Sequence, residues 1–483
     1  MQSTEGASTT KEFEADSCGE KFRKALRDNL FTVLTLIGVV VGFGVGFGIG
    51  TLHPSQVTIT WIKMPGTIFI RLLQLTVLPV IAANIIVVMA KMDLRENGKI
   101  GLATIGFVLA FDLLSGVVGV TTAALIKPGL STSLTVNESD ETLGKNDAPV
   151  TTSDVFADLL LNIFADNVVG LAIFQTKTIR VWTYFPVKNV TEPVQIRLES
   201  TNMIGLIFTS IVFGIAARTA KENGKAFIDL FDSLGNVVLI LMRWFLLATP
   251  VGVCFMVAGA VVGLNDIAGT FQGLGLFMGS VLVALAIHML LQMAIYTLAS
   301  FRNPFRLMVM GFKAFFLSFI TTAPIVAIPE MLETCDRYGI DNKVSRFAIP
   351  FSAALKGDGS GVFQAVACIF IAQQTGYNIT IGTYVIIALL VGFASLAIPS
   401  VPSAAIIIII TILSSVGVST AEVSLLFAVE WIMDRCRSGS MGLGYLFTAA
   451  FAQAIAEGKT KKGQIPNDEE IFVDDLESYT HSK

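Results

Sequence analysis

The stretch FSAALKGDGSGVFQA, Phe351–Ala365, places Lys356 and Asp358 among glycines at the edge of the most apolar part of the chain. No Asp, Glu, Lys or Arg occurs from residue 359 to residue 421. An ionisable side chain at membrane depth is costly and marks a candidate functional site, and glycine weakens a helix interior. The stretch therefore predicts a broken helix that brings both signs of charge into an apolar interior.

The composition is that of an integral membrane protein. Of the 483 residues, 53% are hydrophobic and 14% are charged, whereas a soluble domain carries about 25% charged residues. The net charge of -4 gives no reason to expect a nucleic-acid partner. The five cysteines and three histidines are dispersed, so the sequence predicts neither an enzyme nor a bound cofactor.

Apolar runs and basic loops together predict the topology. Residues 1–29 are polar, contain Lys21, Arg23, Lys24 and Arg27, and lack the short apolar stretch of a signal peptide, so we expect a cytosolic N-terminal segment. A spanning helix needs about 20 apolar residues, and Lys and Arg recur in every second loop, as they do on the cytosolic side. We predict an all-α polytopic membrane protein with both termini cytosolic and eight transmembrane helices, near residues 30–52, 66–90, 100–126, 202–217, 236–261, 274–300, 361–373 with the preceding half, and 423–452.

Two further apolar segments fit this topology only if each enters and leaves the membrane on one side. The first, near 314–334, lies between two basic loops, and the second, near 381–416, is interrupted by Pro399 and Pro402, which cannot donate helix hydrogen bonds. We therefore predict two re-entrant helical hairpins. Irregular backbone at membrane depth must be buried in protein or line a cavity, and transporters build substrate and ion sites in this way.

Two segments lie outside the predicted membrane region. Residues 127–200 form a long polar insertion on the outer side, where the sequons at Asn137 and Asn189 predict glycosylation. The acidic tail, residues 458–483, has the composition of a disordered cytosolic segment.

The predicted last span carries a second group of charges. Asp434, Arg437, Ser438, Met441 and Tyr445 fall on one helical face by their spacing. One interpretation is a zwitterion site, in which Asp434 accepts hydrogen bonds from a substrate ammonium while Arg437 binds a carboxylate. The other is an ion pair within the helix that neutralises itself. The spacing alone leaves both open.

Beyond these patterns, the chain resembles the glutamate/aspartate and neutral amino acid symporter family, the excitatory amino acid transporter type. The resemblance covers about residues 21–457 and rests on the order of spans and hairpins and on four motifs: GDGS at 357–360, AVEWIMDRCRSGS at 428–440, RFAIP at 346–350 and FDSL at 231–234. It implies a sodium-coupled homotrimer, which we expect in the plasma membrane. Residues 30–99 and 202–265 would form a fixed scaffold, and residues 100–126 and 266–457 a transport domain that moves like an elevator.

Matched residue by residue, the resemblance implies a substrate site. Asp434 falls where the family binds the substrate amine, and Arg437 falls where it binds an acidic side chain, which favours glutamate or aspartate. The remaining expected contacts come from the last two spans and both hairpin tips: Ser438, Met441, Ser360, Thr321, Thr322, Ile398, Pro399 and Ser400.

The sequence departs from the family pattern where cations are expected. Lys356 stands at an asparagine position and Ala354 at a threonine position, and sodium prefers oxygen ligands. Gln364 stands at a position that is acidic in glutamate-selective members, which argues against proton coupling. We therefore predict altered or reduced sodium coupling, with Asp358 as the surviving candidate ligand. The expected cation site, intact or degraded, comprises Asp358, Lys356, Asp112, Ser352, Ala354, Met441 and Tyr445.

Lys356 leads to a specific hypothesis. Asp112 and Lys356 are substitutions of opposite sign at positions that face each other in the family, so Lys356 is interpreted as a tethered cation neutralised by Asp112 and Asp358. The alternative is that Lys356 reaches water in the cavity and Asp112 pairs elsewhere.

The expected activity is symport of an acidic amino acid by an elevator mechanism, with no cofactor apart from sodium ions. Three alternatives stay open: a substrate-gated anion channel, a neutral amino acid transporter or exchanger, and a transport-inactive homologue.

Overall fold

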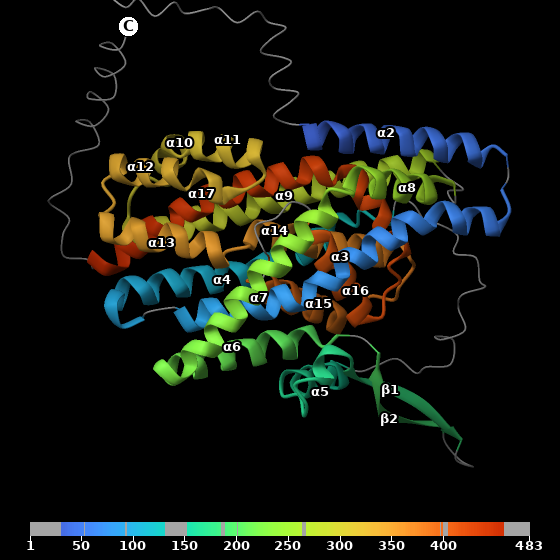
Figure 1. The fold of residues 1–483 in the computed structure, drawn as a ribbon, viewed down its shortest axis with the longest axis horizontal. Helices are drawn as coiled ribbons and strands as arrows, with labels where there is room; N and C mark the ends of the chain where they lie inside the picture. The colour runs from blue at the N-terminus through green and yellow to red at the C-terminus, as the bar shows by residue number, and fades with distance from the viewer. Residues whose placement is uncertain are drawn as a thin grey trace, which may run out of the picture.

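The chain is predominantly helical, and most of its long helices run along the longest dimension of the molecule (Figure 1). The computed structural model describes residues 30–52, 54–91, 94–130, 152–184, 189–199, 201–262, 267–396, 398 and 404–457. The predicted terminal segments, 1–29 and 458–483, lie outside the described residues, as do Asn137, Pro399 and Ser400.

The first half of the chain supplies α2 (Leu30–Gly50), α3 (Gln56–Lys91), α4 (Leu94–Ile126), α6 (Met203–Thr219), α7 (Glu222–Leu246) and α8 (Thr249–Val262). α2 packs along α8, and α3 packs against α6, α7 and α8. Small residues allow this close approach, since a Cβ at Gly38 of α2 would overlap the carbonyl oxygen of Pro250 in α8. α4 instead packs against the helices of the second half of the chain.

The predicted span at 236–261 is not one continuous helix. α7 ends at Leu246, α8 begins at Thr249, and the two are bent by 58° relative to each other. Pro250 lies in the first turn of α8, where its missing N–H is harmless, but it could not continue α7. A hydropathy average does not reveal this break, because the residues on both sides of it are apolar.

The insertion between α4 and α6 contains regular structure that the all-α prediction did not include. α5 (Thr152–Ile163) precedes two antiparallel strands, β1 (Gln175–Tyr184) and β2 (Asn189–Leu198), which pair with Gln175 opposite Leu198. The two strands extend away from the helices (Figure 1). The all-α prediction therefore needs this correction. Composition missed the strands because the insertion is polar and carries no long apolar run.

The second half of the chain forms the region in which the predicted site residues lie. Its helices are α9 (Ile267–Ser300), α10 (Pro304–Met310), α11 (Phe312–Thr321), α12 (Ile328–Tyr338), α13 (Asn342–Leu355), α14 (Asp358–Gln374), α15 (Ile381–Ser395), α16 (Ala404–Val416) and α17 (Phe427–Glu457).

Both predicted hairpin segments contain a helix pair. Between α11 and α12 the chain turns at Thr322, whose φ of 54° is left-handed, and continues through a short 3-10 turn, Pro324–Ala327. Between α15 and α16 the structure describes Leu396 and Ile398. The two connections fall within the predicted ranges 314–334 and 381–416.

α14 is the centre of the fold. Every residue of this helix is buried, and it packs against α4, α9, α15, α16 and α17. A helix that is apolar on all sides belongs in the interior of a large protein. The charged pair that starts it, Lys356 and Asp358, is therefore carried into the middle of the molecule.

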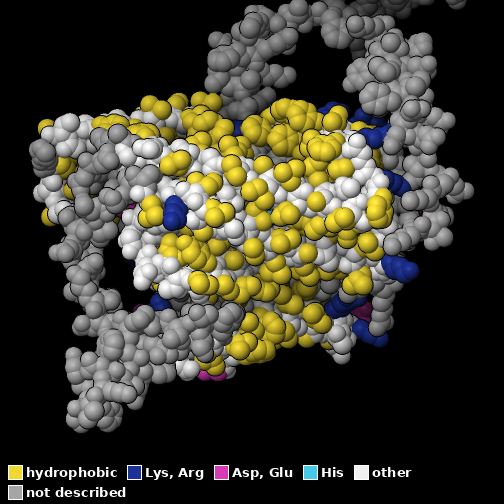
Figure 2. Space-filling model, turned by 180° about the vertical axis from the view of Figure 1, so that it is seen from behind, with side chains coloured by type: hydrophobic (Ala, Val, Ile, Leu, Met, Phe, Trp, Pro, Cys, Tyr) yellow, Lys and Arg dark blue, Asp and Glu magenta, His cyan; other side chains and the backbone are white. Residues whose placement is uncertain are grey.

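The surface agrees with a membrane protein. Figure 2 shows one broad face dominated by hydrophobic side chains, with Lys and Arg gathered mainly at one edge. Among the described residues, five helices are long and apolar enough to span a membrane, or up to seven if each of two bent pairs counts as one. α17 is not among them, since it mixes charged and small residues with apolar ones. The count of eight spans stays a prediction.

Candidate functional site

The helix break predicted at Phe351–Ala365 lies between α13 and α14. α13 ends at Leu355, and Lys356 has φ −85° and ψ 89°, which is not helical. The backbone carbonyl of Lys356 accepts a hydrogen bond of 3.3 Å from the Tyr445 hydroxyl. A Cβ at Gly357 would overlap the carbonyl oxygen of Ser395 at the end of α15, so glycine is required where these two segments meet.

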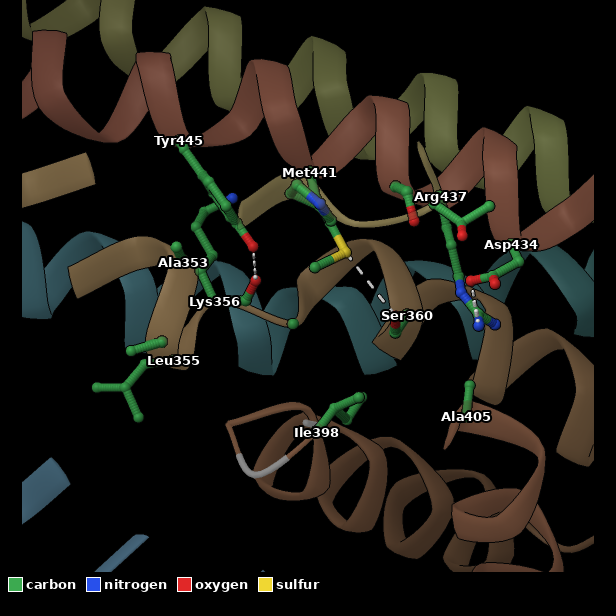
Figure 3. Close-up of a pocket in the computed structure, with 15 residues that line it drawn as sticks. Ala353, Leu355, Lys356, Ser360, Ile398, Ala405, Asp434, Arg437, Met441 and Tyr445 are labelled. Carbon is green, nitrogen blue, oxygen red and sulfur yellow. Dashed lines mark hydrogen bonds and ion pairs between the residues drawn. The ribbon is translucent and has the colours of Figure 1, made fainter. Parts of the chain in front are cut away.

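α17 presents its predicted face to a cavity beside this break. Figure 3 shows Asp434, Arg437, Met441 and Tyr445 along one side of α17, with Ile398 on the opposite side of the cavity. The cavity is narrow in this structure, with a volume of about 30 Å³, far below the roughly 300–1,000 Å³ of small-molecule sites. Its lining also includes Ser360, Ser438, Thr322, Pro324, Ala353, Ala354, Leu355, Lys356, Gly357 and Ala405.

Arg437 is buried and held by two carboxylates of its own helix. Its Nη2 lies 2.6 Å from Asp434 Oδ1 and 3.0 Å from Glu430 Oε1. The guanidinium carbon lies 4.9 Å from the ring centroid of Phe363, within the range of a cation–π contact. Arg437 Nη1 and Glu430 Oε2 have no hydrogen-bond partner among the described residues. The ion pair within the helix exists, and one donor edge of Arg437 remains free beside the cavity.

Lys356 and Asp358 form an ion pair in the interior. Both are 1% exposed, and Lys356 Nζ contacts Asp358 Oδ2 directly. Lys356 Nζ also donates to Gln292 Oε1 at 3.2 Å, and the ring centroids of Phe107 and Phe111 lie 6.0 and 5.9 Å from it. Lys356 is therefore shielded from bulk water, although it belongs to the cavity lining.

Asp112 behaves differently from the hypothesis. It is fully buried in α4, close to the charges of Lys356 and Asp358 and facing Ser395 and Gly357. Neither of its carboxylate oxygens makes a hydrogen bond or ion pair to any described residue with acceptable geometry. The structure thus pairs Lys356 with Asp358 and not with Asp112.

The remaining predicted residues are divided between the cavity and its surroundings. Ser360 Oγ lies 3.8 Å from Met441 Sδ across the cavity. Thr321 instead donates 2.7 Å to the Leu317 carbonyl of its own helix and does not line the cavity. Ser352 is buried outside the lining and its hydroxyl lacks a partner among the described residues. Asn189 begins β2 in the insertion between α4 and α6, and it is not part of the cavity lining.

Sequence reasoning missed three residues of these clusters. Glu430 had no assigned role, and its pairing with Arg437 follows from a spacing of seven residues, two helical turns. His288 and Gln292, one turn apart on α9, contact the Asp358 carboxylate. Their signal in the sequence was weak: two isolated polar residues in the apolar span 274–300.

Comparison with known proteins identifies the family. The profile of the sodium:dicarboxylate symporter family matches residues 31–454. The chain belongs to this family. It is 27% identical to excitatory amino acid transporter 1 of Ambystoma tigrinum, over 91% of this chain and 85% of that protein. It is 29% identical both to excitatory amino acid transporter 3 of Mus musculus, over 92% and 88% of the two chains, and to neutral amino acid transporter B(0) of Oryctolagus cuniculus, over 93% and 84%.

Family membership confirms the resemblance predicted from the motifs. The homologues are membrane transporters and not enzymes, and they include proteins named for excitatory and for neutral amino acids. The family is sodium-coupled by its description. For the substrate of this chain, the family therefore leaves a choice between acidic and neutral amino acids.

Proposed function

We propose that this protein is a secondary active transporter of an acidic amino acid, glutamate or aspartate, with altered or reduced sodium coupling. The observation that carries the proposal is the buried Arg437, whose Nη1 edge is free beside the cavity. A guanidinium recognises a planar carboxylate through paired N–H donors. Asp434, on the same lining, offers a carboxylate to the substrate ammonium.

The coupling part of the proposal rests on Lys356. Its ammonium lies in the interior against Asp358, where the family resemblance leads us to expect a sodium site. A resident positive charge repels a second cation at short range, with an interaction of several kcal/mol in a protein interior. The tethered ammonium therefore replaces one sodium ion, with Asp358 as its principal counterion.

The proposed mechanism is an elevator movement within a homotrimer in the plasma membrane, with both termini cytosolic. Residues 30–99 and 202–265 would be the scaffold, and residues 100–126 and 266–457 would move. Support comes from the packing, since α4 contacts α9, α14, α15 and α17 whereas α2 pairs with α8. Eight spans, two re-entrant hairpins, and glycans at Asn137 and Asn189 belong to the same proposal.

Neutral amino acid transport or exchange is the second candidate. Asp434 and Glu430 already place two carboxylates on Arg437, and this pairing would weaken its attraction for a third. Met441 adds an apolar surface to the same lining.

Uptake into proteoliposomes separates these candidates. Radiolabelled glutamate, aspartate and alanine are supplied with a sodium gradient or with choline in place of sodium. Saturable uptake of glutamate or aspartate, with weak dependence on sodium, is the expected result. Uptake of alanine alone would establish the second candidate. Currents without uptake would indicate an anion channel, and neither uptake nor currents would indicate a transport-inactive homologue.

A double substitution tests the role of Lys356 in coupling. Lys356→Asn with Asp112→Thr removes one positive and one negative charge, and it returns oxygen-bearing side chains that suit sodium. We expect uptake by the double variant to become strongly sodium-dependent. A full sodium requirement already present in the native protein would refute the tethered-cation proposal.

A further inference from the structure

Two polar residues of α9, His288 and Gln292, face the break between α13 and α14. Both side chains are almost fully buried, with exposed fractions of 0% and 1%. His288 Nε2 lies 3.1 Å from the Phe111 carbonyl oxygen, and Gln292 Nε2 lies 3.1 Å from His288 Nδ1. Gln292 Nε2 also lies 2.9 Å from Asp358 Oδ2, and Gln292 Oε1 lies 3.2 Å from Lys356 Nζ.

With a neutral His288 ring, the chemistry of these groups sets the direction of each hydrogen bond. The Phe111 carbonyl can only accept, so His288 Nε2 carries the proton and, in the neutral ring, Nδ1 accepts. The Gln292 amide then donates one N–H to His288 and the other to Asp358. Its oxygen is left for the Lys356 ammonium, which can only donate. A Gln292 amide turned the other way would put N–H groups against the ammonium and leave Asp358 without this donor.

Gln292 thereby contacts both members of the buried ion pair. An ammonium has three donors, and the Asp358 carboxylate alone would leave Lys356 under-coordinated. Gln292 supplies a second acceptor, and the faces of Phe107 and Phe111 lie about 6 Å away. Gly444 of α17 leaves room for the ammonium, since a Cβ at this position would lie 2.7 Å from Lys356 Nζ. The ammonium is confined on several sides by groups from four helices, α4, α9, α14 and α17.

We propose that Gln292 is a positioning residue that holds the Lys356 ammonium and the Asp358 carboxylate together, with His288 fixing the orientation of its amide. This inference rests on the proposed function in one respect: the proposed function gives the tethered ammonium its role at the cation position, and Gln292 would keep it there. It concerns a helix that contributes no residue to the predicted cation site.

The test is a double-mutant cycle on the full-length protein purified in detergent. The apparent Tm is followed through exposure of the buried thiols of Cys335 and Cys368 to a thiol-reactive dye. Gln292→Leu is measured in the native protein and in a Lys356→Gln background. A second background, Lys356→Met with Asp358→Asn, removes both charges together and guards against misfolding caused by an unpaired carboxylate.

A matched control is available in Gln373. This glutamine is also buried, and it bonds to the backbone of Gly129 and Ala123, away from Lys356. Gln373→Leu is measured in the same three backgrounds. Its loss of Tm should be the same in each, since residues without shared partners contribute additively.

Gln292→Leu should lower Tm in the native protein by at least about twofold more than in either background lacking Lys356, because contacting residues are non-additive. Equal losses in all three backgrounds would mean that Gln292 only fills its site, and the proposal would be wrong. The cycle needs no substrate. A protein that shows this coupling but no uptake would overturn the proposed function and leave the positioning role intact.

Discussion

The molecule buries two charged clusters that are assembled in opposite ways. Glu430, Asp434 and Arg437 come from two turns of α17. Lys356 and Asp358 come from the break between α13 and α14 and depend on Gln292 of α9 for further hydrogen bonds. The first cluster moves with a single helix. The second exists only while separate helices stay packed around the break.

Because of this difference, the two charged clusters should respond differently when helices move. Charges neutralised within one helix can be exposed to a changing cavity without losing their partners, which suits a site that a substrate enters and leaves. A cluster built from several helices loses its partners if any one of them shifts. The Lys356 end therefore suits a fixed charge inside a rigid body, and the Arg437 end suits recognition.

The largest expected effect comes from breaking the cluster that spans helices. Lys356→Met leaves the Asp358 carboxylate buried without its counterion, next to the unpaired carboxylate of Asp112. Removing one partner of a buried pair costs about 3–5 kcal/mol. We expect a large loss of folded protein, measured as the monodisperse fraction in size-exclusion chromatography and as apparent Tm.

Removing both charges supplies the control for this prediction. Lys356→Met with Asp358→Asn should lose much less stability than Lys356→Met alone, because an uncharged replacement of a buried pair is often nearly neutral. A single variant as stable as the native protein would show that the pair is not maintained in the membrane protein.

The next effect tests recognition at the α17 cluster. Arg437→Lys keeps the charge but loses the planar fork that could face both its helix partners and a substrate carboxylate. Losing one charged hydrogen bond, about 1.5–3 kcal/mol, lowers kcat/KM for glutamate about ten- to a hundredfold. Alanine uptake, if present, is the internal comparison. An equal loss for both substrates would place Arg437 in folding or movement rather than in selectivity.

A smaller effect of opposite sign is expected at Glu430. Glu430 Oε1 accepts a hydrogen bond of 3.0 Å from Arg437 Nη2, and Glu430 Oε2 has no hydrogen-bond partner among the described residues. Glu430→Gln removes a negative charge that competes with an acidic substrate, so KM for glutamate should fall about three- to tenfold, equivalent to about 0.6–1.4 kcal/mol. Competition uptake measures the change. A rise in KM would mean that Glu430 orients Arg437 rather than competing for it.

The same contrast explains what the sequence could predict. The α17 cluster follows from helical spacing, which is local, and the break at Lys356 follows from neighbouring glycines. The pairing of Lys356 with Asp358 rather than Asp112 depends on how α4 and α14 pack, which spacing within one segment does not specify. His288 and Gln292 were missed for that reason, since each is a lone polar residue in an apolar span. The break before Pro250 was missed because the residues on both sides of it are apolar, so a hydropathy average does not reveal it. The strands β1 and β2 were missed because they lie in a polar insertion without a long apolar run.

The smallest effect is expected at Asp112, and Asp358, which lies beside the same ammonium, serves as the comparison. The Asp112 carboxylate makes no hydrogen bond or ion pair to a described residue, whereas the Asp358 carboxylate accepts from Lys356, Gln292 and the Gly359 N–H. Asp112→Asn breaks no ion pair and no carboxylate hydrogen bond among the described residues, so stability should be unchanged or rise by about 1 kcal/mol. Asp358→Asn should lower it, since Lys356 then loses its counterion. Apparent Tm of the two variants, measured side by side without substrate, checks the contrast. If Asp112→Asn were the more damaging variant, Asp112 would be the main counterion of Lys356, and the cluster would have to include α4 as an equal partner.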